Sequence, residues 1–510
     1  CTILAVAPSP VDENVIWVGT DDGNVQITKD GGKTWKNTSN EMPNCPKNAW
    51  IPQIEVSIKN AGEAFVVVNH YRFNDWKPYL YHTSDYGNTW KRLANEKQVE
   101  GFCLSVVQDP IEGNLLFLGT DKGLYYSIDA GNNWIKWKEL PSVPIYDMKI
   151  HPRDHDLILG TFGRSIMIMD NLEPLRALAQ SNKKIADKPF VVFQPAKAYL
   201  ADWRSYEGAR FGADAYFKGD AKGTGANIML WMKQSEKKIE KTIQSDSTKI
   251  SKEEKKEDKK DNKKKATLYV IDSNLDTIRT TKTEIDTGFT HIYWSLERKG
   301  IRMPSRNEPK EDADEPWGIS VLPGTYKLVI SCGENKDSTS IQVLPDPNDQ
   351  VLPEVAKSRY QAALSFYKTI EKLTTGVDRM REMEKTIKLT NDQWVNVPDS
   401  IKKDVVKQSS GIKDTIENYK KLIFGTEGGK GIQRNPNTII NNIWTALSYI
   451  NSKTNATNSN ADISTKFATE KIEEMVGKIN NLIQKDWVVF KENASKIPYS
   501  LFKTIEPIKN

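Results

Sequence analysis

An eight-residue pattern occurs three times in the first third of the chain, and it limits the fold more than any other feature. Each copy, called an octet below, reads Ser/Thr-x-Asp-x-Gly-x-x-Trp, and the copies recur at roughly 45 to 55 residues, the length of a four-stranded β-propeller blade with its loops. In such a pattern the Asp can accept backbone N–H groups of a tight turn, the Gly can take a positive φ, and the Trp can pack between sheets. We therefore expect a folding role, not catalysis, for the octet residues Thr28, Asp30, Gly32 and Trp35; Thr83, Asp85, Gly87 and Trp90; and Ser127, Asp129, Gly131 and Trp134.

Apolar strands that end in Gly-Thr mark the same repeat unit. They lie at residues 16–20, 116–120 and 157–161. The last of them belongs to a fourth unit, at 145–170, which keeps the strands but has no octet. The repeats predict four blades within residues 1–175, with short antiparallel strands in each.

Three segments, at residues 17–26, 75–81 and 160–166, resemble a known family. The chain is similar to the bacterial BNR-repeat (Asp-box) proteins with a sortilin-like (VPS10) β-propeller, which are often labelled glycosyl hydrolases because they resemble xyloglucanase-type propeller enzymes. The resemblance covers the C-terminal portion of the family's chain, so it implies further blades before Cys1 and an open, partial propeller here. It also implies export to the periplasm, the cell surface or beyond, with a signal peptide outside this sequence. Phe162 stands where the family usually carries His, so no role is carried over to that position.

The pattern of apolar residues changes twice after the blades. Residues 188–347 alternate in short strands, which predicts a β-sandwich of the immunoglobulin-like class, interrupted by a disordered charged insertion at 233–265. Residues 350–510 have apolar residues at three- and four-residue steps over 356–388, 400–423, 438–452 and 463–485, which predicts a C-terminal antiparallel helical bundle. We expect Met380, Met383 and Trp444 in its core.

Composition excludes several classes of function. The net charge is only +5 and both signs are mixed along the chain, so we expect no nucleic-acid partner. No apolar stretch is long enough for a membrane span. The four cysteines are widely separated and the close pair His151 and His155 has no third ligand candidate nearby, so we expect no metal. Without a phosphate loop or a dinucleotide motif, we expect no cofactor.

The segment 69–81 is the best candidate for a ligand-binding surface because it combines aromatic side chains, a cation and an acid. In the alternative interpretation, Trp76 and Tyr79 pack the blade edge and Arg72 pairs with Asp75. Arg164, in the last blade, is a weaker candidate, since a strand-end arginine often ties blades together. The ligand-binding candidates are thus His70, Arg72, Asp75, Trp76, Tyr79 and Arg164.

Two functions remain open at this stage. The first is an exported propeller protein that binds a polypeptide or a glycan, and the alternative is a glycoside hydrolase that acts on a polysaccharide. Hydrolysis needs two carboxyl groups that face each other across the scissile bond, and no acid stands out from the octets. A pair of carboxylates outside the octets, on the inner strands of the blades, would favour the hydrolase.

Overall fold

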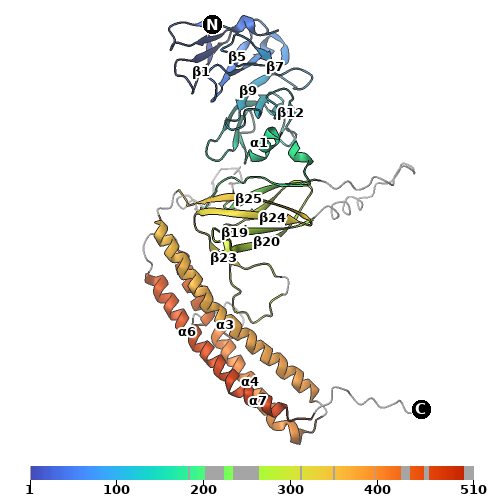
Figure 1. Cartoon of the computed structure of the whole chain (residues 1–510), viewed down its shortest axis with the longest axis vertical. Helices are drawn as coiled ribbons and strands as arrows, with labels where there is room; N and C mark the ends of the chain where they lie inside the picture. The colour runs from blue at the N-terminus through green and yellow to red at the C-terminus, as the bar shows by residue number, and fades with distance from the viewer. Residues whose placement is uncertain are drawn as a thin grey trace, which may run out of the picture.

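The computed structural model describes residues 2–181, 184–201, 223–233, 264–310, 313–347, 351–394, 397–426, 437–452 and 459–498. Over these residues the chain is mainly β, with many sheets followed by long helices. Figure 1 shows the sheets in succession from the N-terminus, with the helices beyond them. The expected disordered insertion lies, apart from its first and last residues, outside the described residues.

The first part of the chain forms four successive antiparallel meanders, called blades 1 to 4 below. Hairpins join neighbouring strands in each, and the first strands β1, β5, β9 and β13 lie next to one another along the series. Blade 4 has three strands, as its missing octet suggests. The strands are β1 (Ile3–Pro8), β2 (Ile16–Thr20), β3 (Val25–Thr28) and β4 (Lys36–Asn37); β5 (Trp50–Val56), β6 (Ala64–His70), β7 (Asp75–Thr83) and β8 (Lys91–Arg92); β9 (Cys103–Gln108), β10 (Leu116–Thr120), β11 (Gly123–Ser127) and β12 (Ile135–Lys136); and β13 (Ile145–Ile150), β14 (Leu157–Thr161) and β15 (Ile166–Met169).

Apolar clusters join each blade to the next. Trp17 of blade 1 and Trp90 of blade 2 meet edge to face, with ring centroids 5.9 Å apart, and Trp134 of blade 3 donates its indole N–H to the Leu93 carbonyl of blade 2. Trp35 differs, since 42% of its surface is exposed and it donates to Gly32 of its own turn. Among the described residues Trp35 therefore does not pack between two sheets, which differs from the expectation for the octet tryptophans.

Helix α1 (Glu173–Gln180) follows the last blade and packs on blades 3 and 4. Its Arg176 is buried and holds the carboxylate of Asp109, which follows β9, through Nε and Nη2 at 2.8 to 3.0 Å. Nη1 of the same guanidinium donates to Glu173 at 2.6 Å. A buried charge pair of this kind is stable only when its donors and acceptors are satisfied, and here it fixes where the helix lies.

Two sheets then face each other around a shared core. One contains β16 (Phe190–Val192), β18 (Ala226–Met232) and β21 (Gly288–Trp294). The other contains β17 (Ala198–Tyr199), β25 (Asn335–Leu344), β24 (Gly324–Cys332), β19 (Lys264–Ile271) and β20 (Thr277–Ile285), with β17 parallel to β25. A two-stranded ribbon of β22 (Glu297–Lys299) and β23 (Trp317–Ser320) accompanies them. The immunoglobulin-like class of this arrangement stays a prediction.

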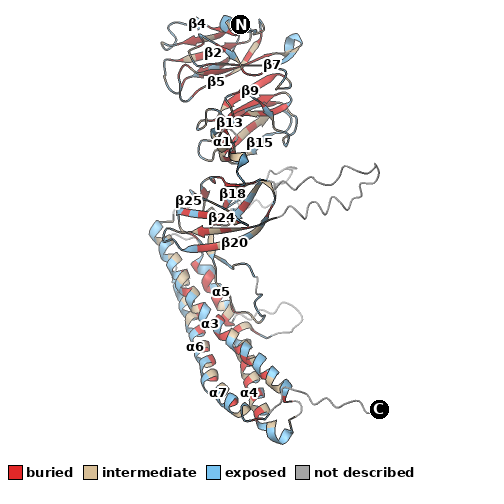
Figure 2. Ribbon diagram, turned by 45° about the vertical axis from the view of Figure 1, so that its right-hand side comes forward, coloured by how far each residue is buried: buried red, intermediate tan, exposed pale blue. Residues whose placement is uncertain are grey.

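The last described helices share one apolar core, and their buried sides face inward in Figure 2. Met380 and Met383 lie in it as expected, whereas Trp444 is 54% exposed, so the expectation for Trp444 is wrong. The ribbon contacts α3 directly, since Arg298 of β22 donates a hydrogen bond to the Tyr360 hydroxyl at 2.9 Å. The helices are α3 (Pro353–Gln393), α4 (Asp399–Phe424), α5 (Ile439–Ile450), α6 (Ser459–Gln484) and α7 (Asp486–Ala494).

Candidate functional site

The predicted site segment forms the hairpin between the second and third strands of blade 2. Strand β6 ends at His70, a single 3-10 turn follows at Tyr71–Phe73, and Asn74 takes a left-handed conformation with φ of 63° before β7 begins. His70 and Asp75 then pair across the two strands. This tight connection presents the side chains between His70 and Asp75 at the end of the blade.

An aromatic group surrounds this hairpin, and we call it the aromatic platform. Phe73 and Trp76 are 61% and 54% exposed. The ring of Tyr71 stacks on Phe102, which precedes β9 of blade 3, at 4.5 Å between centroids, and Trp76 meets the same ring edge to face at 5.7 Å. The hairpin is thus held against the neighbouring blade while two of its aromatic rings stay open to solvent. The platform consists of Trp50, Tyr71, Phe73, Trp76 and Phe102.

Arg72 contributes a planar cation to the platform. Its guanidinium carbon lies 3.1 Å from the centroid of Trp50 and 4.4 Å from that of Tyr71, so it stacks on two rings. Within the described residues no ion pair joins Arg72 to Asp75, which was the pairing expected in the alternative interpretation. Arg72 is exposed. Stacking on the two rings, and not an ion pair with a carboxylate, fixes the orientation of its guanidinium plane.

Asp75 is engaged inside the hairpin. Its Oδ2 accepts a hydrogen bond from the Tyr79 hydroxyl at 2.8 Å and lies 3.7 Å from Nδ1 of His70. Tyr79 is buried, and burial, followed by the nearby Asp75 carboxylate, raises its pKa to about 12. His70, Asp75 and Tyr79 therefore support the hairpin from within, whereas Arg72 and Trp76 lie on its surface.

Arg164 lies in the hairpin between β14 and β15, two blades further along the chain. Because this is also a second-to-third-strand hairpin, it emerges at the same end of the strands as the aromatic platform. Arg164 is exposed, and the neighbouring Phe162 is within 5.9 Å of Tyr146 between ring centroids. The structure does not bring Arg164 into the platform.

The octets lie in the hairpins between third and fourth strands, at the opposite end of the blades. In each, the Ser or Thr hydroxyl donates to the Asp at 2.8 Å, and the carboxylate accepts a backbone N–H four residues on at 2.8 to 2.9 Å. These hydrogen bonds, led by those from Thr89, lower the pKa of Asp85 to about 2. Carboxylates held ionised in a turn are poor proton donors, which is in keeping with a folding role.

Glu55 is a candidate that the sequence analysis missed. It lies half-buried on the inner strand β5, and burial raises the pKa of its carboxyl to about 7, with Asp147 of β13 raising it further and Lys149 of β13 opposing the shift. These residues place carboxyl groups outside the octets on inner strands of blades 2 and 4. The alternation of polar residues in β5 (Gln53, Glu55) and β13 (Asp147, Lys149) was the only signal available in the sequence.

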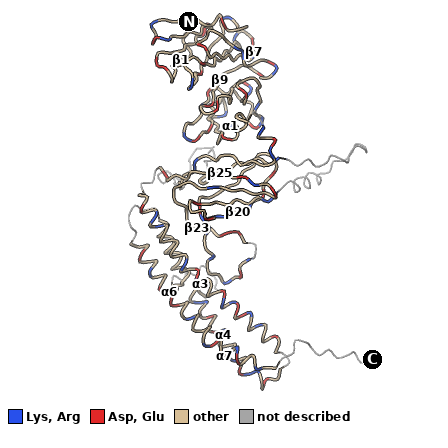
Figure 3. The backbone as a smooth tube through the Cα atoms, viewed as in Figure 1, with Lys and Arg blue, Asp and Glu red and all other residues tan. Residues whose placement is uncertain are grey.

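Among the described residues, no group of three or more His, Cys, Asp or Glu side chains could hold a metal ion. Over the same residues, no helix is both long and apolar enough to cross a bilayer. Along the backbone drawn in Figure 3, Lys and Arg positions are interspersed with Asp and Glu positions over the described residues.

No protein-family model matches the sequence, and no curated protein matches it significantly. Solved structures match it in part. A GH74 xyloglucanase from Xanthomonas campestris is 16% identical, with a TM-score of 0.29, and covers 33% of this chain and 29% of its own. YCF48 from Cyanidioschyzon merolae is 20% identical, with a TM-score of 0.24, over 33% of this chain and 56% of its own. An ancestral GH74 enzyme is 14% identical, with a TM-score of 0.24, and the match covers 68% of this chain and 57% of that enzyme. The chain spans less than two thirds of the length of each, and these likenesses assign it no activity.

Proposed function

We propose that this chain belongs to an exported, sortilin-like Asp-box propeller protein that binds a polypeptide ligand at the aromatic platform of blade 2. The observation that carries the proposal is the exposed pair of rings, Phe73 and Trp76, beside a guanidinium that is stacked on Trp50 and still open to solvent. Trp, Tyr and Arg are the side chains that dominate binding energy at protein interfaces. Export rests on the family resemblance alone.

The charges near the platform favour an acidic ligand segment. Arg72 and Lys77 are exposed on the hairpin, whereas the carboxylate of Asp75 is already engaged by Tyr79. A flat guanidinium can donate two parallel hydrogen bonds to a carboxylate. Phe73 offers only an apolar surface, so a polypeptide with apolar and acidic residues fits these side chains better than a glycan does.

The test is a selection from a displayed library of random twelve-residue peptides on the full chain. We expect enrichment of sequences that combine aromatic or aliphatic residues with Asp or Glu. The enriched peptides should bind Trp76→Ala and Arg72→Gln at least tenfold more weakly, and the matched surface control Trp444→Ala should bind them like the unchanged chain. Peptides that bind all variants equally, or a library without enrichment, would contradict the proposal. If the unchanged chain bound a glycan and both Trp76→Ala and Arg72→Gln lost that binding, the ligand of the platform would be a glycan and not a polypeptide.

A second candidate function, glycoside hydrolysis, is favoured by Glu55. A general acid in this reaction needs a carboxyl that keeps its proton near neutral pH, and burial gives Glu55 a pKa of about 7. Asp147 on β13 would supply the second carboxyl. The test is release of reducing sugar from uncharged polysaccharides by the full chain. Release that disappears in Glu55→Gln supports hydrolysis, and release that the substitution leaves unchanged contradicts this assignment.

A further inference from the structure

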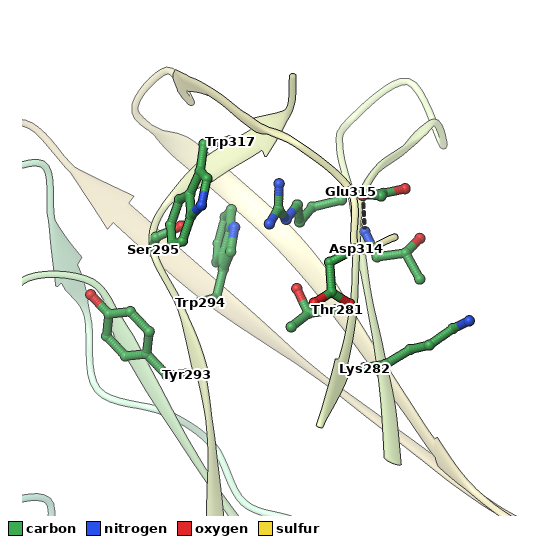
Figure 4. Close-up of a pocket in the computed structure, with 10 residues that line it drawn as sticks. Thr281, Lys282, Tyr293, Trp294, Ser295, Asp314, Glu315 and Trp317 are labelled. Carbon is green, nitrogen blue, oxygen red and sulfur yellow. Dashed lines mark hydrogen bonds between the residues drawn. The ribbon is translucent and has the colours of Figure 1, made fainter. Parts of the chain in front are cut away.

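A second site lies outside the blades, in the two-sheet part of the chain. A pocket of about 260 Å³ is lined by residues of β20, β21 and β23 and by the segment before β23. In Figure 4, Trp317 and Tyr293 lie on one side of it, and Asp314, Thr281 and Lys282 on the other. The residues that define it are Arg279, Lys282, Tyr293, Asp314, Glu315 and Trp317.

Two aromatic rings of the pocket are open to solvent. Trp317 is 73% exposed, the largest exposure of any tryptophan among the described residues, and Tyr293 is 49% exposed. The flat faces of these two rings suit flat apolar surfaces of a ligand.

The charges that border the rings balance one another. Arg279 and Lys282 supply two cations, and Asp314 and Glu315 supply two carboxylates. A pocket with no net charge has little attraction for phosphate or for an acidic chain, whereas it offers both donors and acceptors for hydroxyl groups. A pyranose ring has the matching chemistry, with an apolar C–H face and a rim of hydroxyl groups.

The walls of the pocket are held in place before any ligand binds. Arg279 donates to the Pro316 carbonyl at 2.6 Å, and the Thr280 backbone N–H donates to Glu315 at 2.7 Å, so the segment before β23 is fastened to β20. The backbones approach so closely at Gly300, directly after β22, and at Gly318 of β23 that neither glycine has room for a Cβ. Such preorganisation lowers the entropy that binding would otherwise lose.

We propose that this pocket binds a neutral saccharide, with a sugar ring stacked on Trp317 and its hydroxyl groups bound by Asp314 and the neighbouring charged side chains. The site is separate from the aromatic platform and does not depend on the function proposed for it. It would hold the protein on a polysaccharide while the blades act elsewhere.

The test is isothermal titration calorimetry of the full chain with the uncharged oligosaccharides cellohexaose, xylohexaose, mannohexaose and laminarihexaose. We expect at least one to bind, and Trp317→Ala to weaken that binding at least tenfold. Asp314→Asn provides a second variant that removes a charge and keeps the size of the side chain, and it should weaken binding severalfold. The matched surface control Trp444→Ala should bind as the unchanged chain does.

Three results would overturn the proposal. One is the absence of binding by all four oligosaccharides in the unchanged chain. The second is binding that Trp317→Ala leaves intact. The third is binding of charged polygalacturonate in place of the neutral probes. Failure of peptide binding at the platform would leave these results unaffected, because Trp76 does not contribute to the pocket.

Discussion

Arg72 lies over Trp50 with its guanidinium carbon 3.1 Å from the ring centroid, and this contact joins the hairpin of blade 2 to the start of that blade. A cation–π contact at an exposed site contributes about 0.5 to 1 kcal/mol. We therefore expect Arg72→Gln to lower the free energy of unfolding by about 1 kcal/mol or less while it weakens peptide binding at least tenfold. Denaturant unfolding and a binding assay on the same sample check this. A large loss of stability would mean that Arg72 acts mainly in folding.

The buried pair of Arg176 and Asp109 predicts a large effect on stability. Removal of one partner leaves the other charge buried without compensation, which costs about 3 to 5 kcal/mol. We expect Arg176→Ala to destabilise the chain by this amount, and Arg153→Ala, on the surface, to change stability by less than about 0.5 kcal/mol. Urea unfolding of both variants gives the comparison. Equal, small effects would contradict the role assigned to the pair.

The octet tryptophans should differ from one another. Trp134 is buried between blades 2 and 3, so Trp134→Ala should cost about 3 to 5 kcal/mol. Trp35 is 42% exposed, so Trp35→Ala should cost less than about 1 kcal/mol. Melting curves of both variants test the difference, and similar losses would show that Trp35 packs against a further surface.

Glu55 predicts a dependence of stability on pH. Its pKa is about 7 in the folded chain, against an ordinary value of 4.5, so the folded state keeps a proton that the unfolded state releases. This contribution to stability is fully present below about pH 4.5 and is lost as the pH rises through about 7.

We therefore expect Glu55→Gln to become more stable relative to the unchanged chain as the pH rises from 4 to 8, measured by melting temperature. Lys149 favours the ionised form of Glu55, so Lys149→Met should make the melting temperature fall more steeply than that of the unchanged chain as the pH rises. A difference between Glu55→Gln and the unchanged chain that stays constant across this range would contradict the raised pKa.

The repeated octets and the periodicity of apolar residues predict much of the β structure and the helices, because both patterns are local. The octet turn is determined by four side chains within eight residues, and the strands follow from alternation. Whether a side chain such as Trp35 or Trp444 is buried depends on the part of the chain that packs against it, and a local sequence pattern does not contain that information.

The same limit applies to the candidate site. The hairpin residues were identifiable from composition, but the stacking of Arg72 on Trp50 joins residues that lie apart in the sequence, and the expected pairing with Asp75 took no account of it. Glu55 was missed because its pKa depends on burial and on two residues of another blade.

The most direct test of the platform is the affinity of the full chain for its selected peptide, measured by isothermal titration calorimetry before and after Trp76→Ala. If the platform binds the polypeptide, the substitution weakens binding at least tenfold, while Trp317→Ala and Trp444→Ala leave the dissociation constant unchanged. A dissociation constant that Trp76→Ala does not change would contradict the proposal.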